Sequence, residues 1–110
     1  SEDRDATLPG DACWEERKRS TLNYLRACKD ADILTVCFAD KLANLRALRA
    51  DCARYGEKLW ERFHQKNKSL IAAYYYGLMQ IFTCFSGCPH YEQYRELYRE
   101  VFGTQPQTTL

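Results

Sequence analysis

Asp40 is the side chain whose surroundings most favour chemistry in this chain of 110 residues. It follows a run, residues 33–39, in which every residue except Thr35 is apolar. If this run is helical, Asp40 lies off the solvated face, since its neighbours three and four positions away include Cys37 and Ala43. Burying an unpaired carboxylate costs several kcal/mol, so Asp40 would then need a metal ion or a basic side chain beside it.

Asn44 lies one helical turn beyond Asp40 and shares its face. Its amide can hydrogen-bond a ligand or the neighbours of the carboxylate. The small side chains of Ala43 and Ala47 would leave space above this face of the helix, which could then form the floor of a pocket.

An ordinary structural role for Asp40 is the alternative. A helical carboxylate can lie at the edge of its helix or pair with a basic residue, and Lys18 and Arg17 are the candidates. Both belong to the run Glu15-Glu16-Arg17-Lys18, whose charges are also typical of a solvated helix face. The residues alone leave open whether Asp40 binds a metal or forms an ion pair.

A second group of reactive side chains lies in the segment Cys84-Phe85-Ser86-Gly87-Cys88-Pro89-His90. It places two thiols and an imidazole around a turn. Zinc prefers four such ligands, so a zinc site would need a further residue such as Cys13. A redox-active or disulfide-forming pair of Cys84 and Cys88 is the second interpretation, and two ordinary thiols at a helix junction are the third.

The chain has six cysteines, which we expect to be free thiols in a cytoplasmic protein. Small disulfide-stapled folds are rich in loops, whereas Gly and Pro are sparse here. No apolar signal segment is present at the N-terminus, and most of the cysteines lie in helical patterns, where a thiol packs as a small hydrophobic group.

Composition and charge restrict the classes of function. The 16 basic and 15 acidic side chains leave a net charge of +1, which excludes a polybasic nucleic-acid binder. The length and the 45% of hydrophobic residues fit one small globular domain, and no stretch approaches the ~18 apolar residues of a membrane span. With only His64 and His90 present, the chain alone cannot build multi-histidine metal sites or most His-based triads.

Apolar residues recur with helical spacing, which predicts an all-α domain of four or five helices over residues 11–102. We expect a flexible segment 1–10, helices over about Asp11–Cys28, Ala31–Arg54, Leu59–Phe63, Ser69–Phe85 and Tyr91–Phe102, and a mobile tail 103–110. Asp11 can cap the first helix, and Asp30 or Asp32 the second. Gly56 is the glycine expected just past the end of the second helix.

Two sets of tyrosines are expected to pack rather than to bind bases. Tyr74, Tyr75 and Tyr76 point about 100° apart on a helix and cannot form one stacking platform. Three further tyrosines in the last helix form a stripe that should pack on the preceding helix: Tyr91, Tyr94 and Tyr98.

The segment Phe38-Ala39-Asp40-Lys41-Leu42-Ala43-Asn44-Leu45-Arg46 resembles a motif of HD-domain phosphohydrolases, in particular those of the RelA/SpoT alarmone-hydrolase type. The resemblance covers about residues 9–83. It includes Pro9 with Trp14-Glu15-Glu16-Arg17-Lys18 before the motif, and Gly56–Phe63 and Tyr74–Tyr76 after it. It implies an HD-domain-like helical bundle and hydrolysis of a nucleotide or a (p)ppGpp-like alarmone.

In that family an early His, a His-Asp pair and a last Asp hold a divalent cation, usually manganese. Such an ion lowers the pKa of a bound water and orients it toward a phosphoryl centre. The resemblance implies that Asp40 is the last metal ligand and that Asn44 contacts the nucleotide. It also implies that Lys18 and Arg17 face the substrate phosphates.

The chain departs from the family because it contains no His-Asp dipeptide. His64 and His90 both follow Asp40, in the wrong order and context for the missing ligands. We therefore expect the C-terminal portion of such a domain, inactive alone and able to associate with a missing N-terminal half. The alternative is a non-catalytic helical module, derived from an HD domain, that binds a protein partner or forms a homodimer.

Overall fold

The computed structural model describes residues 10–63, 67–103, 105–106 and 108–110. Within these ranges the chain is all-α, as predicted, and contains no strand. Its elements are α1 (Gly10–Ala27), α2 (Ala31–Tyr55), the 3₁₀ helix η1 (Gly56–Arg62), α3 (Lys68–Ile81), the 3₁₀ helix η2 (Phe82–Phe85) and α4 (Pro89–Phe102). The predicted flexible segment lies outside the described residues, except for Gly10 at the start of α1.

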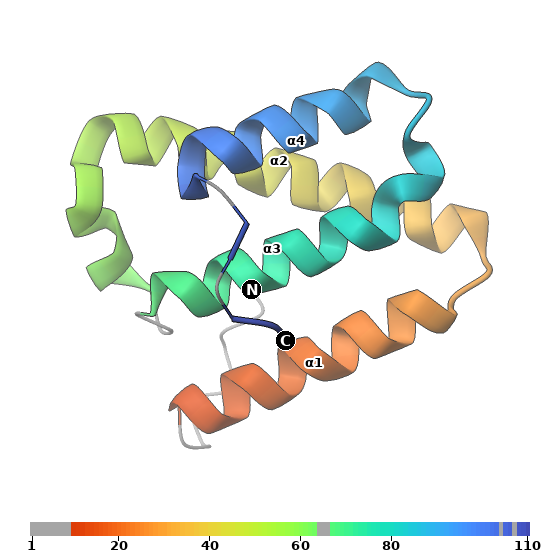
Figure 1. Ribbon diagram of the computed structural model, residues 1–110, viewed down its shortest axis with the longest axis horizontal. Coiled ribbons are helices and arrows are strands. Elements are labelled where there is room, and N and C mark those ends of the chain that lie inside the picture. Colours follow the sequence, from red (N-terminus) through yellow and green to blue (C-terminus); the bar gives the residue numbers. More distant parts are fainter. Residues whose placement is uncertain (1–9, 64–66, 104, 107) are drawn as a thin grey trace.

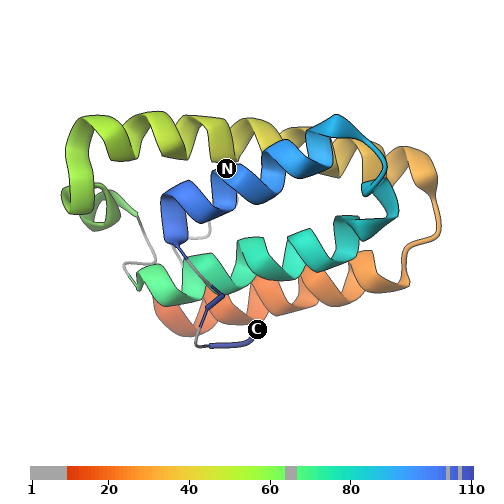
Figure 2. The ribbon, with the colours of Figure 1, turned by 45° about the horizontal axis from the view of Figure 1, so that its top comes forward.

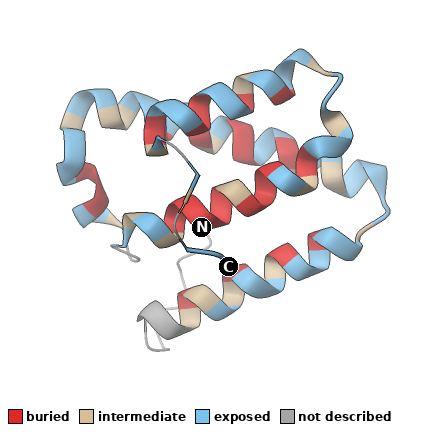
Figure 3. Cartoon of the chain, viewed as in Figure 1, coloured by how far each residue is buried: buried red, intermediate tan, exposed pale blue. Residues whose placement is uncertain are grey.

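The helices form two packed pairs. α1 packs on α3, and α2 packs on α4. Figure 1 shows α3 in the middle of the fold, and Figure 2 shows the two pairs from a second direction. Because α3 also packs on α4, it joins the pairs and is the most buried helix (Figure 3).

The ends of α2 follow the predicted signals. The Asp30 carboxylate accepts hydrogen bonds from the backbone amides of Asp32, at 2.9 Å, and Ile33, at 3.3 Å. Such a cap satisfies amides that have no partner inside the helix. Gly56, with φ of 62°, ends the helix in a backbone conformation that favours glycine.

Three other boundaries differ from the sequence-based expectation. α1 begins at Gly10, so the predicted cap Asp11 lies within its first turn. The predicted short helix Leu59–Phe63 is the 3₁₀ helix η1. The helix predicted over Ser69–Phe85 is α-helical only to Ile81, and the Thr83 hydroxyl donates to the carbonyl of Gln80 at 2.9 Å in the tighter turn that follows.

The core forms where the helical stripes meet. The stripe predicted on α2 is buried, with Leu34 only half-buried at its start: Phe38, Leu42, Leu45 and Leu48. The Phe38 ring packs against both Phe82 and Phe85, with ring centroids 5.1 and 4.9 Å away. Such aromatic pairs stabilise a core beyond the area that they bury.

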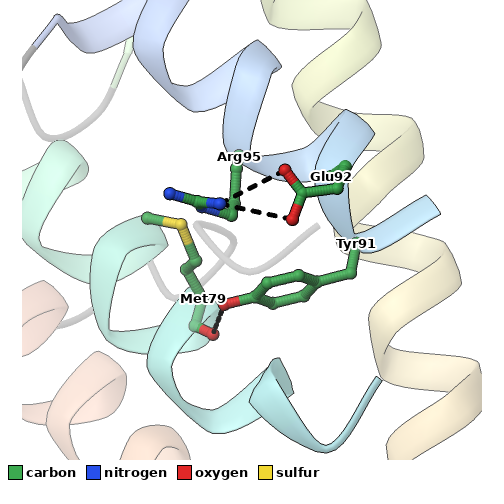
Figure 4. A network of polar contacts seen from close by, with 4 residues as sticks. All are labelled: Met79, Tyr91, Glu92 and Arg95. Carbon is green, nitrogen blue, oxygen red and sulfur yellow. Dashed lines mark hydrogen bonds and ion pairs between the residues drawn. The ribbon is translucent and has the colours of Figure 1, made fainter. Parts of the chain in front are cut away.

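The tyrosine stripe of α4 is buried against α3, as predicted. The Tyr94 hydroxyl donates to the carbonyl of Tyr75 at 2.8 Å. The Tyr91 hydroxyl donates to the carbonyl of Met79 at 3.3 Å, beside an exposed ion pair of Glu92 and Arg95 (Figure 4). Buried hydroxyls need such partners, so these bonds fix how α4 lies on α3.

α1 approaches α3 closely at Gly77. A Cβ atom at this position would lie 3.0 Å from Cδ1 of Leu22, which is fully buried. Described tail residues, 105–106 and 108–110, lie against α3 and α1 (Figure 1), and the side chain of Leu110 packs on the core. The mobility expected of the tail stays a prediction.

Candidate functional site

A hollow of about 690 Å³ opens between α1 and α2. Tyr74 of α3 contributes to its lining, and the helices on either side contribute Lys18 and Tyr24 from α1, and Asp40 and Lys41 from α2. The hollow is therefore built by two consecutive helices, α1 and α2, together with one residue of the more distant α3. Its volume is in the range of small-molecule sites.

Asp40 lies at this hollow but is exposed, so the expectation that it lies off the solvated face is wrong. Its side chain is 63% exposed, and its carboxylate Oδ2 lies 3.5 Å from Nζ of Lys41. Two of the apolar neighbours of Asp40 are themselves at the surface, with Val36 69% exposed and Ala43 also exposed, while Cys37 is half-buried. The buried face of α2 is the stripe that contains Phe38 and Leu42, and Asp40 lies outside that stripe.

Two lysines are buried beside the Tyr74 ring. Nζ of Lys18 lies 4.7 Å from the ring centre, and Nζ of Lys41 lies 5.7 Å from it. Lys18 also lies 5.8 Å from the ring of Trp14. An aromatic face is electron-rich, so it stabilises an ammonium group that burial has removed from water. The alternative of a fully solvated Glu15–Lys18 run is wrong for Lys18, which is 3% exposed.

The other predicted site residues lie farther from this arrangement. Arg17 is half-buried, and its carbonyl accepts a hydrogen bond from the Thr21 hydroxyl at 3.0 Å. Asn44 is half-buried one turn along α2 from Asp40. Neither is among the residues that line the hollow. Of the four predicted site residues, Asp40 and Lys18 thus line the hollow, whereas Arg17 and Asn44 do not.

The rim of the hollow is apolar. Three large hydrophobic side chains are exposed there: Tyr24, Ile33 and Val36. Their exposed fractions are 58%, 40% and 69%, which is high for aliphatic and aromatic groups on adjacent helices. The hollow therefore combines an apolar rim with charged groups near its base.

Asp40 alone does not fit a manganese ion, which needs several oxygen or nitrogen ligands. Among the residues that the structure describes, no group of three or more His, Cys, Asp or Glu side chains could hold a metal. His64 lies outside the described residues. For the same part of the chain, the zinc interpretation of Cys84, Cys88 and His90 lacks a ligand set.

All six cysteines are free thiols in the structure. Burial raises the pKa of Cys37, against the opposing charge of Lys41, and burial also raises the pKa of Cys52. Cys84 is exposed and Cys88 is half-buried, with its Sγ 3.3 Å from Nδ1 of His90. The thiols therefore differ in how far they are buried and in which charged or polar groups lie beside them.

Sequence reasoning missed Lys41 and Tyr74 as parts of the hollow. Lys41 comes three residues after Phe38 and four before Leu45, so its spacing places it on the buried stripe of α2. That spacing was the available signal. Tyr74 had no such signal, because its contact with both lysines depends on how three helices pack.

No known protein-family model, curated protein or solved structure matches this chain. In the described ranges, none of the helices has the length and apolar character needed to cross a membrane.

Proposed function

We propose that this chain is the C-terminal part of an HD-type, metal-dependent phosphohydrolase that acts on a nucleotide or a (p)ppGpp-like alarmone. The observation that carries the proposal is the exposed Asp40 carboxylate at a hollow that also holds Lys18 and Lys41. A carboxylate that must reach a shared metal has to be accessible. The resemblance of the segment Phe38–Arg46 to the family motif supplies the type of reaction.

The two lysines give the hollow the charge that a phosphorylated substrate requires. An ammonium group in a partly enclosed site interacts with phosphate more strongly than it does in open water. The Tyr74 ring holds both ammonium groups near the base of the hollow, and Asp40 pairs with Lys41 at its edge. In this proposal Lys18 binds phosphate within the hollow. Arg17 and Asn44 do not line it, so Arg17 would bind phosphate and Asn44 would contact the nucleotide where the substrate extends beyond the hollow.

The remaining ligands of the metal would come from outside this chain. Asp40 supplies one ligand, and the early His and the His-Asp pair would come from a polypeptide that packs beside it. The chain alone is then inactive. Because nucleotides and alarmones are cytoplasmic, the proposed substrate implies that the protein acts in the cytoplasm.

The decisive experiment joins this chain to the polypeptide encoded directly upstream. We expect that sequence to contain the early His and the His-Asp pair. The extended protein should bind Mn²⁺ in a calorimetric titration and should release pyrophosphate from guanosine tetraphosphate only when Mn²⁺ is present. Asp40→Asn should abolish both signals, because it removes the anionic oxygen from the ligand set.

Asp51→Asn is the matched control, since Asp51 lies on the same helix and outside the hollow. It should leave metal binding and turnover unchanged. Upstream sequence without these ligands, or an Asp40→Asn protein that binds Mn²⁺ as strongly as the unmodified one, contradicts the proposal.

A second candidate function is self-association as a non-catalytic module. The exposed side chains of Tyr24, Ile33 and Val36 favour it, because apolar groups gathered on one face mark interaction surfaces. Sedimentation of this chain would then show a homodimer that Val36→Lys dissociates. Ala53→Lys, at an exposed position later on α2, should leave the dimer intact. A monomer at all concentrations rules this candidate out.

A further inference from the structure

The turn between η2 and α4 holds a thiol against an imidazole. Sγ of Cys88 lies 3.3 Å from Nδ1 of His90. The turn itself is fixed by the backbone, because the Cys88 amide donates to the carbonyl of Phe85 at 2.8 Å and the Tyr91 amide donates to the carbonyl of Cys88 at 3.0 Å. The backbone that carries the thiol and the ring is therefore held by bonds that do not depend on either side chain.

The same pair opens into a hollow that is separate from the one at Asp40. This second hollow has a volume of about 370 Å³ and lies between α2 and the start of α4. Phe38, Leu42 and Phe85 give it apolar walls. Its polar lining residues are Thr35, Arg46, Cys88 and His90. Arg46 is held there by a hydrogen bond from its guanidinium to Oε1 of Gln93, at 2.6 Å.

The chemistry of these groups suits a nucleophile. A thiol reacts as its thiolate, and an adjacent imidazole can accept the proton. In the tautomer that carries its hydrogen on Nε2, Nδ1 of His90 faces Cys88 as an acceptor. Burial raises the pKa of Cys37 and of Cys52 and so disfavours the thiolate at these two positions.

We propose that Cys88 is a covalent modification site at which a small anionic disulfide exchanges with the thiol. His90 accepts the proton, and the guanidinium of Arg46 faces the anionic part of the reagent. This site is independent of the proposed hydrolase function, because it involves neither Asp40 nor the hollow beside it.

The exchange is balanced without any further reactant. The Cys88 proton passes to Nδ1 of His90, and Sγ attacks one sulfur of the disulfide. A new S–S bond forms to Cys88 while the S–S bond of the reagent breaks. The leaving thiolate takes the proton from His90, so Cys88 is oxidised and the leaving half of the reagent is reduced.

The first test compares the alkylation of individual cysteines by iodoacetamide in the native chain, followed by mass spectrometry of the peptides. Cys84 is the matched thiol, since it is exposed whereas Cys88 is half-buried. If accessibility alone set the rates, Cys84 would react faster. We expect Cys88 to react about tenfold faster than Cys84, because the imidazole of His90 contacts Cys88.

His90→Gln tests the role of the imidazole. His90 is exposed in the first turn of α4, so its replacement should leave the helix content unchanged, which circular dichroism checks. The rate at Cys88 should fall to about that of Cys84, and the rate at Cys84 should not change. A Cys88 rate that is unaffected by His90→Gln, or that is below the Cys84 rate in the native chain, overturns the proposal.

Oxidised glutathione, an anionic disulfide, tests the ligand class. The Cys84→Ser chain is used, so that Cys84 cannot displace the product, and a mixed disulfide should accumulate at Cys88. Adding Arg46→Gln should slow this reaction about threefold while leaving the reaction with neutral iodoacetamide unchanged. The absence of a mixed disulfide at Cys88 overturns the proposed reaction, and equal slowing with both reagents overturns the proposed role of Arg46.

Discussion

The ammonium nitrogen of Lys18 lies 4.7 Å from the centre of the Tyr74 ring, although Lys18 is only 3% exposed. Lys41 approaches the same ring from α2, at 5.7 Å. One aromatic side chain of α3 therefore faces buried positive charges from the two helices that border the hollow beside Asp40. The ring thus supports both the fold and the charge of the candidate site.

Two replacements of Tyr74 should distinguish the contribution of its ring to stability from that of its hydroxyl. Tyr74→Leu removes the aromatic face from two buried ammonium groups and leaves space in the core, so we expect it to lower the free energy of unfolding by about 3 kcal/mol. Tyr74→Phe keeps the ring and should cost about 1 kcal/mol or less. Guanidinium unfolding measures both, and equal losses would show that the ring contacts do not matter.

The hydrogen bond from Tyr94 to the carbonyl of Tyr75 should contribute measurably to stability. Tyr94 is fully buried, so Tyr94→Phe removes the bond while retaining the packing of the ring. We expect a loss of about 1–2 kcal/mol in the free energy of unfolding. Tyr24→Phe, at a side chain that is 58% exposed, is the control and should change stability little.

Stability should fall in alkaline solution. Burial raises the pKa of Tyr98 to about 12, and it raises the pKa of Tyr94 well above the ordinary value. An unfolded tyrosine has a pKa of about 10, so the folded chain favours the protonated phenol. The stabilisation is complete below about pH 10 and is lost as the pH rises through about 12.

Urea unfolding at several pH values between 8 and 12 measures this loss. Tyr98→Phe removes one of the titrating groups, so its stability should decline less steeply over this range than that of the unmodified chain. Absorbance of tyrosinate near 295 nm follows the same titration. A parallel decline in both chains would contradict the assigned role of Tyr98.

The cap at the start of α2 should be worth about 1 kcal/mol, as other N-caps are. Asp30→Ala removes the acceptor for the amides of Asp32 and Ile33 and should lower the thermal midpoint. Asp30→Ser retains a side-chain oxygen and should restore most of the loss. If both variants melt alike, the carboxylate does not act as a cap.

Local pattern was sufficient to predict the helices. The stripe from Phe38 to Leu48 repeats at helical spacing, and Asp30 and Gly56 have the side-chain and backbone properties that helix ends require. The change from α-helix to 3₁₀ helix at Phe82 was not predicted, because apolar spacing continues through Phe85. Apolar periodicity does not distinguish the two helix types over one turn.

The candidate site was less predictable for a physical reason. Apolar neighbours suggested that Asp40 is buried, but the burial of a helix face depends on which other helix covers it, and Val36 beside Asp40 is 69% exposed. The meeting of Lys18, Lys41 and Tyr74 likewise arises from three separate helices. Sequence spacing describes neighbours within one helix and not the contacts between helices.

The close approach of Gly77 and Leu22 restricts how this sequence can diverge. A Cβ atom at position 77 would lie 3.0 Å from Cδ1 of Leu22, so the buried Leu22 side chain would have to shift by a few tenths of an ångström. Substitutions at positions 22 and 77 are therefore expected to depend on each other during evolution. A chain that acquires alanine at position 77 should retain the spacing of α1 and α3 if the Leu22 side chain shifts slightly or if a smaller residue replaces it in the same lineage.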